Sequence, residues 1–191
     1  MLSDLVTRCS LTALFFLVSP ADAGERYKID PEHTYSSFEY KHWGWSLQRG
    51  RFDKNIGYLE LDLAARAGVV NIEIDANSVS TGFNMFNHVM RSEDFFDAQQ
   101  YPKIVFNSTK LLFDQDNLTQ IEGLLTIKDR SKAVTIDVTQ FGCRLMFLSR
   151  KRACGAHGTT KILRSDFKMG SYANFVSDEI TLYFSVEGIK E

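Results

Sequence analysis

The residues with side chains suited to acid–base or metal chemistry are few and poorly spaced for it. His33 and His42 lie nine positions apart, so on one continuous strand they would point to opposite faces of a sheet. Zinc needs three or four converging ligands, and no clear third ligand accompanies this pair. We therefore expect no metal site, and we expect both histidines to hydrogen-bond the start of a strand to the neighbouring sheet.

Carboxylates and serines give little support to catalysis either. Asp30 and Glu32 flank a proline, which favours a solvated turn over an acid–base pair. Ser92 is not part of a Gly-x-Ser-x-Gly motif, and the chain has no Gly-rich phosphate loop. Arg164 and Asp166 are two apart, hence on one face of a strand, where they form either a buried polar cluster or a contact for a ligand headgroup.

The N-terminal residues 1–23 have the pattern of an export signal. The apolar run Leu11–Val18 is too short to cross a bilayer, and the small-residue sequence Ala21-Asp22-Ala23 follows it. We expect cleavage before Gly24 and export of the mature protein. The alternative is an amphipathic N-terminal helix that stays buried in the fold.

Two cysteines, Cys143 and Cys154, remain after such a cleavage, because Cys9 lies in the leader. An even pair in an oxidising compartment predicts a disulfide, which contributes roughly 3 kcal/mol by chain entropy. With His157 the pair matches zinc-ligand spacing poorly, which favours the disulfide over a metal site.

The composition of the chain limits the classes of partner. The net charge is −2, and −1 once the leader with its one basic and two acidic residues is removed. A nearly neutral body argues against a nucleic-acid partner. Residues 24–191 contain no linker-like stretch, so we expect a single domain. Aromatic residues make up 13% of the chain, which suits half-buried strands and leaves apolar surface for a ligand.

Alternating hydrophobicity dominates residues 24–191 and predicts an all-β fold. Six runs alternate apolar and polar side chains: 36–42, 70–75, 104–109, 121–127, 134–139 and 180–186. Gly57, Gly68 and the polar runs 114–117 and 128–131 are the predicted turns. Short turns favour antiparallel pairing, and closing about eight such strands gives a β-barrel with an interior for side chains or one small ligand.

Strand parity selects the side chains that point into this barrel. The predicted lining consists of Phe38, Tyr40, Ile72, Ile74, Phe106, Val134, Ile136, Leu182 and Phe184. A register error of one residue would invert any one of these strands.

One segment, Met85–Asp97, breaks the alternation. Its apolar residues recur at helical spacing, which predicts a short amphipathic helix across one end of the barrel. Phe86, Val89 and Met90 then face the interior, either as core packing or as a movable lid.

Trp43-Gly44-Trp45 is the densest aromatic point of the chain. Both tryptophans fit a cavity mouth or a tip that touches a membrane, and they fit simple packing at the barrel end equally well. We include Trp43 and Trp45 among the candidate ligand contacts.

Several motifs resemble those of one known family. They are Tyr27-x-Ile29-Asp30-x-x-His33, Gly50-x-Phe52, Arg91-Ser92-Glu93-Asp94-Phe95-Phe96-Asp97, Tyr101-Pro102-Lys103-Ile104-x-Phe106 and Arg164-Ser165-Asp166-Phe167. Together they resemble the YceI-like family over essentially all of residues 24–191. The resemblance implies a lipocalin-like barrel in the periplasm whose cavity takes up a long apolar chain, such as a polyisoprenoid, a quinone tail or a fatty amide. Some members of this family have paired cysteines in a late hairpin, and Cys143 and Cys154 match that arrangement.

The chain departs from the family pattern at a few polar positions. Val89 and Met90 stand where the family usually has His-Leu, with His88 one residue early, and Lys168 replaces a glycine. The resemblance therefore carries over the apolar lining and not the polar role of the family histidines.

The sequence as a whole predicts an exported binding protein for a small apolar ligand. We expect no catalytic residue, no metal or other cofactor beyond a bound lipid, no nucleic-acid partner and no stable membrane insertion. Polar contacts to the ligand would come from His33, His42, Arg164 and Asp166. An enzyme acting on a lipid or quinone and a stress-related structural barrel without ligand stay open as alternatives, and so does a homodimer.

Overall fold

The computed structural model describes residues 24–191, and it shows that these residues form one continuous antiparallel sheet. The predicted leader, residues 1–23, lies outside the described residues. The elements are β1 (Glu25–Ile29), β2 (Tyr35–His42), β3 (Ser46–Phe52), β4 (Asn55–Asp62), β5 (Ala67–Asp75), η1 (Ala76–Ser78), β6 (Val79–Ser80), α1 (Asn84–Arg91), β7 (Lys103–Asp114), β8 (Asn117–Ile127), β9 (Arg130–Leu145), β10 (Arg152–Leu163), η2 (Arg164–Phe167) and β11 (Glu179–Lys190).

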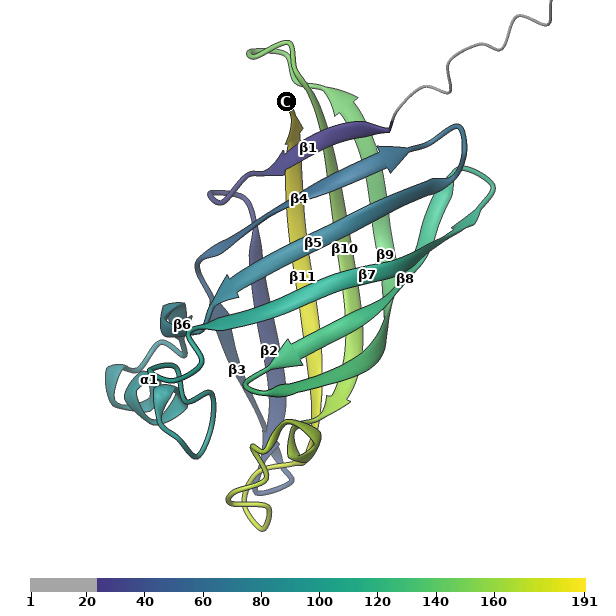
Figure 1. Cartoon of the computed structure of the whole chain (residues 1–191). Helices are drawn as coiled ribbons and strands as arrows, with labels where there is room; N and C mark the ends of the chain where they lie inside the picture. Colours follow the sequence, from purple (N-terminus) through teal and green to yellow (C-terminus); the bar gives the residue numbers. More distant parts are fainter. Residues whose placement is uncertain (1–23) are drawn as a thin grey trace, which may run out of the picture.

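Eight of these strands close into a ring, in the order β1-β4-β5-β7-β8-β9-β10-β11 (Figure 1). The closure is the pairing of β1 with the last residues of β11, where Tyr27 faces Lys190. Closing the sheet gives every strand of the ring a hydrogen-bonded neighbour on both sides. The prediction of an antiparallel barrel of about eight strands with one short helix is confirmed.

The strand β11 has a second partner near its start. Residues 181–185 of β11 pair with residues 35–39 of β2, so β1 and β2 lie one after the other along the same edge of β11. Pro31, between β1 and β2, has no N–H to donate to a ladder, which suits a break at this point. An arm made of β2, β3 and β6 therefore leaves the ring at one end of the barrel.

The two ends of the barrel differ, and we name them by what lies there. The helix end holds α1, the β2–β3 turn at residues 43–45 and the loop 164–178 (Figure 1). The hairpin end holds the β9–β10 turn at residues 146–151, which projects beyond the rim (Figure 1). Both ends matter for the site.

The apolar faces that strand parity predicts point into the interior. Phe38, Ile72, Phe106 and Ile136 are all buried, and each belongs to the inward set of its own run. Period-2 alternation fixes the face because successive side chains of a strand point to opposite sides of the sheet.

Two of the glycines predicted as turns lie inside strands instead. Gly57 is in β4, where a φ of 149° and the carbonyl of Asn71, only 2.0 Å from where a Cβ would stand, leave room for no side chain. Gly68 is in β5, and the turn before it comes at residues 63–66. The predicted turns at 114–117 and 128–131 are present.

The helix is shorter than the predicted segment 85–97. Both the N–H and the hydroxyl of Ser92 donate to the carbonyl of Val89, at 3.1 and 2.7 Å, which closes the last turn of α1. Irregular turns then run to Gln100. Within residues 24–191, no helix combines the length and the apolar character needed to cross a membrane.

The predicted disulfide is confirmed. Cys143 of β9 faces Cys154 of β10 across the hairpin, and the two sulfurs are bonded. The bridge lies at the base of the projecting turn and ties its two strands together.

Candidate ligand-binding site

Two apolar cavities lie inside the barrel. Cavity 1, of about 80 Å³, lies at the helix end, between the strands and the α1 segment. Its lining consists of Ser36, Ser37, Phe38, Tyr40, Phe52, Ile74, Phe86, Met90, Phe95, Phe96, Ile104, Leu125, Ile127, Ile162, Arg164, Met169, Val176, Ile180, Leu182 and Phe184. A cluster of rings forms part of this wall, with the Phe52 and Phe96 ring centres 5.0 Å apart.

Cavity 2, of about 60 Å³, lies toward the hairpin end. Its lining consists of Leu59, Leu61, Val70, Ile72, Ile74, Phe106, Leu118, Ile121, Ile136, Val138, Phe141, Cys154, Gly155, Ala156, His157, Gly158, Phe184 and Val186. His157 is the one polar ring in this wall, and Cys154 is in the disulfide.

The two cavities adjoin, because Ile74 and Phe184 line both. Ile74 belongs to β5 and Phe184 to β11, strands that are not neighbours in the sheet order. The barrel interior is thus a narrow apolar space in two parts, with these two side chains at the boundary between them.

Two glycines make room for rings in this interior. A Cβ on Gly50 would lie 2.3 Å from the Phe38 ring, and one on Gly123 would lie 2.6 Å from the Phe106 ring. Both glycines come from strands that pair with the strand carrying the ring. Each ring can therefore lie flat over a neighbouring strand, Phe38 in cavity 1 and Phe106 in cavity 2.

Arg164 is the one positively charged residue in the wall of cavity 1. It is 3% exposed and donates to the carbonyls of Ser177 at 2.9 Å, Ser171 at 2.7 Å, Val176 at 3.1 Å and Met169. Burial lowers the pKa of its guanidinium. Because four of its five N–H groups are occupied by the loop 164–178, it holds the helix end closed and has little donor capacity left for a ligand.

Asp166 does not share a face with Arg164 as predicted. The two residues lie in η2 and not in a strand, so two positions along the chain do not bring side chains to one side. Asp166 points outward, where its carboxylate accepts from Lys132 at 3.1 Å. It lies in the wall of neither cavity.

The two histidines are also separate from the interior. His33 precedes β2 and His42 ends it, so the length of the strand separates them. The Nδ1 of His33 lies 2.8 Å from Asp30, which raises the pKa of His33 and lowers that of Asp30. His42 packs edge-on to Trp43 at the helix end, 6.0 Å between ring centres.

One group of residues has the donor types of a metal site. Within residues 24–191, the coordinating atoms of Asp30, His33 and Glu187 lie within 4.8 Å of one another. Two of the three are exposed, and Asp30 already engages the imidazole of His33. None of the three residues lines either cavity.

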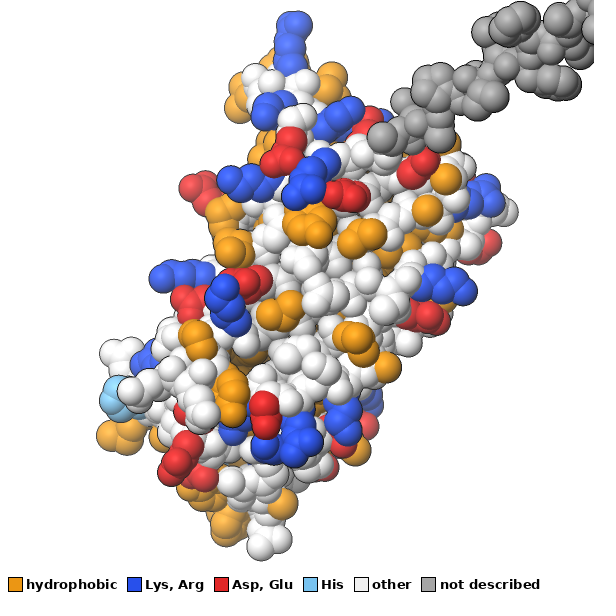
Figure 2. Space-filling view, viewed as in Figure 1, with side chains coloured by type: hydrophobic (Ala, Val, Ile, Leu, Met, Phe, Trp, Pro, Cys, Tyr) orange, Lys and Arg blue, Asp and Glu red, His pale blue; other side chains and the backbone are white. Residues whose placement is uncertain are grey.

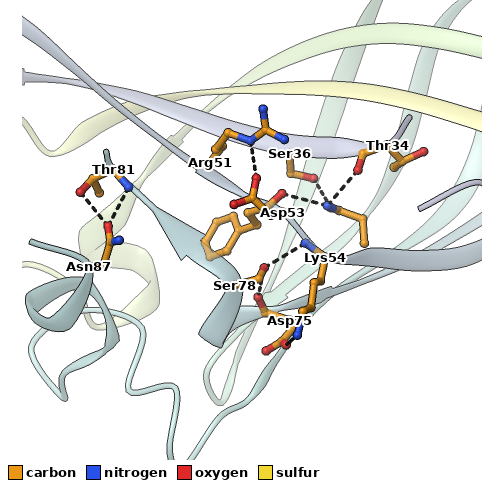
Figure 3. Close-up of polar contacts among 11 residues, drawn as sticks. Thr34, Ser36, Arg51, Asp53, Lys54, Asp75, Ser78, Thr81 and Asn87 are labelled. Carbon is orange, nitrogen blue, oxygen red and sulfur yellow. Dashed lines mark hydrogen bonds and ion pairs between the residues drawn. The ribbon is translucent and has the colours of Figure 1, made fainter. Parts of the chain in front are cut away.

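Polar contacts stabilise the segment from η1 to α1 at the helix end (Figure 3). The N–H and hydroxyl of Thr81 both donate to the amide oxygen of Asn87 in α1, at 2.7 and 2.8 Å. The N–H of Lys54 donates to the hydroxyl of Ser78, which donates to the carbonyl of Asp75 (Figure 3). The contact between Thr81 and Asn87 ties α1 to the residue that follows β6, and Phe86 and Met90 of the same helix line cavity 1.

Of the predicted lining, ten side chains reach a cavity: Phe38, Tyr40, Ile72, Ile74, Phe86, Met90, Phe106, Ile136, Leu182 and Phe184. Val89 is 38% exposed, because an eight-residue helix buries only a narrow stripe, here Phe86 and Met90. Val134 packs on the core but borders a surface hollow beside η2.

Trp43 and Trp45 lie outside both cavities, at the tip of the β2–β3 turn. Trp43 packs on Phe175 with 4.6 Å between ring centres, whereas Trp45 is 84% exposed. Trp43 therefore fits packing at the barrel end, whereas Trp45 is left exposed to solvent.

Much of the wall was not among the predicted contacts. Phe95 and Phe96 follow the helix in an irregular segment, where parity gives no face, although they belong to a family-like motif. Leu59 and Leu61 alternate in β4, and this short signal could have revealed them. No sequence signal indicated Ala156 and Gly158 of β10, because small residues contribute little to a hydrophobic pattern.

This interior can bury an apolar molecule and offers few groups for chemistry. Tyr40, whose pKa burial raises, and the occupied Arg164 are the ionisable residues in the wall of cavity 1. Such a lining binds a ligand mainly by removing the ligand's apolar surface from water.

Comparison with known proteins gives one consistent result. The YceI-like domain profile matches residues 27–188. Protein YceI of Salmonella arizonae is 32% identical over 185 residues, which is 95% of each chain. The crystal structure of Burkholderia cenocepacia BcnA superposes with a TM-score of 0.70 at 26% identity, covering 83% of this chain and 98% of the other. A polyisoprenoid-binding domain from Saccharophagus degradans shares the fold, with a TM-score of 0.66 at 18% identity over 86% and 98% of the two chains.

Proposed function

The chain belongs to the YceI-like family, and from this membership and its two adjoining apolar cavities we propose that it sequesters or carries a long apolar ligand in the barrel. The observation that carries the proposal is the continuous apolar wall shared at Ile74 and Phe184. At about 25 cal/mol per Å² of apolar surface, burying several hundred Å² gives on the order of 10 kcal/mol before ordering costs are subtracted.

The small volume of the two cavities favours a slender chain. A space of about 10–15 Å³ holds one water molecule, so cavities of about 80 and 60 Å³ are small. A polyisoprenoid, a quinone tail or a fatty amide would thread such a space more easily than a fused-ring lipid. A chain that occupies both cavities would contact Ile74 and Phe184, which line both.

We place the protein in the periplasm, as a single domain spanning residues 24–191 that follows a cleaved leader. The disulfide between Cys143 and Cys154 supports an oxidising compartment. We also propose binding without catalysis, since Arg164 is engaged by carbonyls and His33, His42 and Asp166 lie away from the cavities.

The test is native mass spectrometry of protein purified from a periplasmic extract, followed by solvent extraction. We expect an adduct of one defined mass, and thermal stabilisation when a polyisoprenol is added to stripped protein; ligand at 100 times its Kd gives about 2.7 kcal/mol. Leu182→Trp, which fills cavity 1, should remove most of the adduct. Tyr183→Trp, on the outer face of the same strand, is the matched control and should keep it.

A protein with no adduct and no stabilisation would contradict the proposal and favour a structural barrel filled by its own side chains. Equal loss of adduct in Leu182→Trp and Tyr183→Trp would place the ligand outside the barrel. Turnover of a bound lipid or quinone that single alanine changes at His33, His42, Arg164 or Asp166 abolish would favour the enzyme alternative.

A further inference from the structure

The turn between β9 and β10 exposes large apolar side chains at the hairpin end. Phe147 is 93% exposed, Leu148 is 94% exposed and Leu145 is 68% exposed. The turn projects from the rim, and Figure 2 shows apolar and basic side chains together on this projection. We call residues 144–152 the hairpin tip.

The hairpin tip is strongly basic in a chain that is slightly acidic overall. It contains four cationic residues, Arg144, Arg150, Lys151 and Arg152, and no Asp or Glu occurs between Asp137 and Asp166. Arg152 pairs with Glu25 at 3.8 Å. In residues 24–191, no carboxylate forms an ion pair with the other three.

Two acidic residues of the nearby rim already have cationic partners. Glu25 accepts from Lys190 at 2.7 Å, and Glu191 pairs with Arg26 at 3.0 Å. The tip itself therefore presents net positive charge, which attracts anions.

The turn has a defined geometry. The N–H of Met146 donates to the carbonyl of Lys151 at 2.8 Å, and that of Arg150 donates to the carbonyl of Met146 at 2.9 Å. Arg150 adopts a φ of 55°, a conformation that glycine reaches at lower cost, so a cation occupies a position where the backbone favours glycine. The Cys143–Cys154 bridge ties the base.

From these observations we propose that the hairpin tip is a docking surface for an anionic phospholipid bilayer. Phe147 and Leu148 insert among the acyl chains, and Arg144, Arg150 and Lys151 contact the phosphates. A bilayer fits better than a protein partner, because a convex tip with side chains exposed on all sides suits a fluid phase that closes around it. This contact is peripheral and reversible.

Docking would bring cavity 2 next to the membrane. Phe141 and Cys154 line this cavity and lie on the same two strands as the tip. Transfer of a ligand between barrel and bilayer at this end rests on the proposed function, whereas docking itself does not.

The test is flotation of the protein with phosphatidylcholine vesicles, with and without phosphatidylglycerol. We expect binding to the anionic vesicles that weakens about tenfold in pure phosphatidylcholine or at high salt. Phe147→Ser with Leu148→Ser, and separately Arg144→Gln with Lys151→Gln, should each weaken it by about tenfold or more. The thermal midpoint should not change, because these side chains are exposed.

The helix end supplies the matched control. Trp43→Ser with Trp45→Ser removes exposed apolar surface at the opposite end, so anionic-vesicle binding should persist. As a second readout, Phe147→Trp in a Trp43→Phe, Trp45→Phe background should give a blue-shifted emission on anionic vesicles, whereas the native tryptophans should not shift.

Three outcomes would overturn the docking surface. These are no flotation with anionic vesicles, equal loss of binding in the Trp43 and Trp45 variant, or binding to soluble polyglutamate without binding to vesicles, which would indicate an acidic protein partner. The lipid adduct should survive in the Phe147 and Leu148 variant, so failure of docking and failure of ligand binding are distinguishable.

Discussion

The two ends of the barrel are stabilised in different ways. At the helix end, an irregular loop of residues 164–178 closes the interior, and the buried guanidinium of Arg164 ties it together through four carbonyls. At the hairpin end, β1 pairs with β11 by a regular ladder, and a disulfide joins β9 to β10.

The difference follows from where the backbone groups find partners. Strands satisfy their own carbonyls across the ladder, whereas a loop that turns inward leaves carbonyls that only a side chain can reach. The helix end therefore needs a buried donor. The hairpin end does not, which leaves its side chains free for the surface.

The largest effect should come from Arg164. Arg164→Met removes four hydrogen bonds and leaves buried carbonyls without donors, so we expect a loss of about 4 kcal/mol in the free energy of unfolding. Denaturant unfolding measures this, and amide exchange should show lost protection in residues 165–178 before the rest of the barrel.

Asp166→Asn is the matched control, because it breaks an exposed ion pair two residues away. Its expected cost is about 0.5 kcal/mol or less. Similar costs for the two variants would mean that Arg164 does not hold the helix end closed.

The second effect concerns the opposite end. Replacing both Cys143 and Cys154 by serine should cost about 3 kcal/mol, mostly because the unfolded chain loses a constraint. Unfolding with and without reductant measures this, and reductant should not affect the double variant. Exchange should increase around the hairpin and not in the loop 164–178; an increase at both ends would show that the ends are coupled.

The sequence predicted the barrel because most strands alternate on a period of two. Strands made of small or polar residues show no such alternation and were not predicted. Examples are β10, which contains Gly155 and Gly158, and β3, which contains Gly50. Gly57 was predicted as a turn because a glycine alone does not distinguish a turn from a close approach inside a strand.

The site was partly predictable for the same reason. Parity correctly gives the inward face of a strand, as for Phe38 and Leu182, but it says nothing of the irregular segment with Phe95 and Phe96. Nor can spacing along the chain predict that Arg164 and Asp166 fall in a 3-10 helix, where side chains two apart diverge. Tertiary contacts decide these positions.

A smaller effect on stability should come from a buried tyrosine in β1, at the hairpin end. Tyr27 is fully buried and donates to Glu25, and burial, with this bond, raises its pKa to about 12. The unfolded chain releases this proton near pH 10, so stability falls as pH rises from about 10 toward 12.

Tyr27→Phe removes the ionisable group and should flatten that alkaline decline by about 1 kcal/mol at pH 11, after a neutral-pH loss of about 1 kcal/mol for the hydrogen bond. Unfolding free energies of both proteins at pH 7, 9 and 11 measure the difference. Parallel profiles would mean that Tyr27 ionises equally in the folded and unfolded chains.

The smallest effect lies between the two ends, where β1 stops and β2 begins. The Asp30 carboxylate, 2.8 Å from Nδ1 of His33, raises the pKa of His33, and Glu187 adds to this from farther away. The raised His33 pKa stabilises the fold at pH below about 6.5, and this contribution is lost as pH rises through the raised value. The lowered Asp30 pKa stabilises the fold above about pH 4, and this contribution is lost on acidification. The pair therefore stabilises the fold mainly between these two limits.

Titration of the His33 imidazole by NMR should show a large fall in its pKa in Asp30→Asn and a smaller one in Glu187→Gln. The reverse order would mean that Glu187 of β11, and not Asp30, is the main partner of His33.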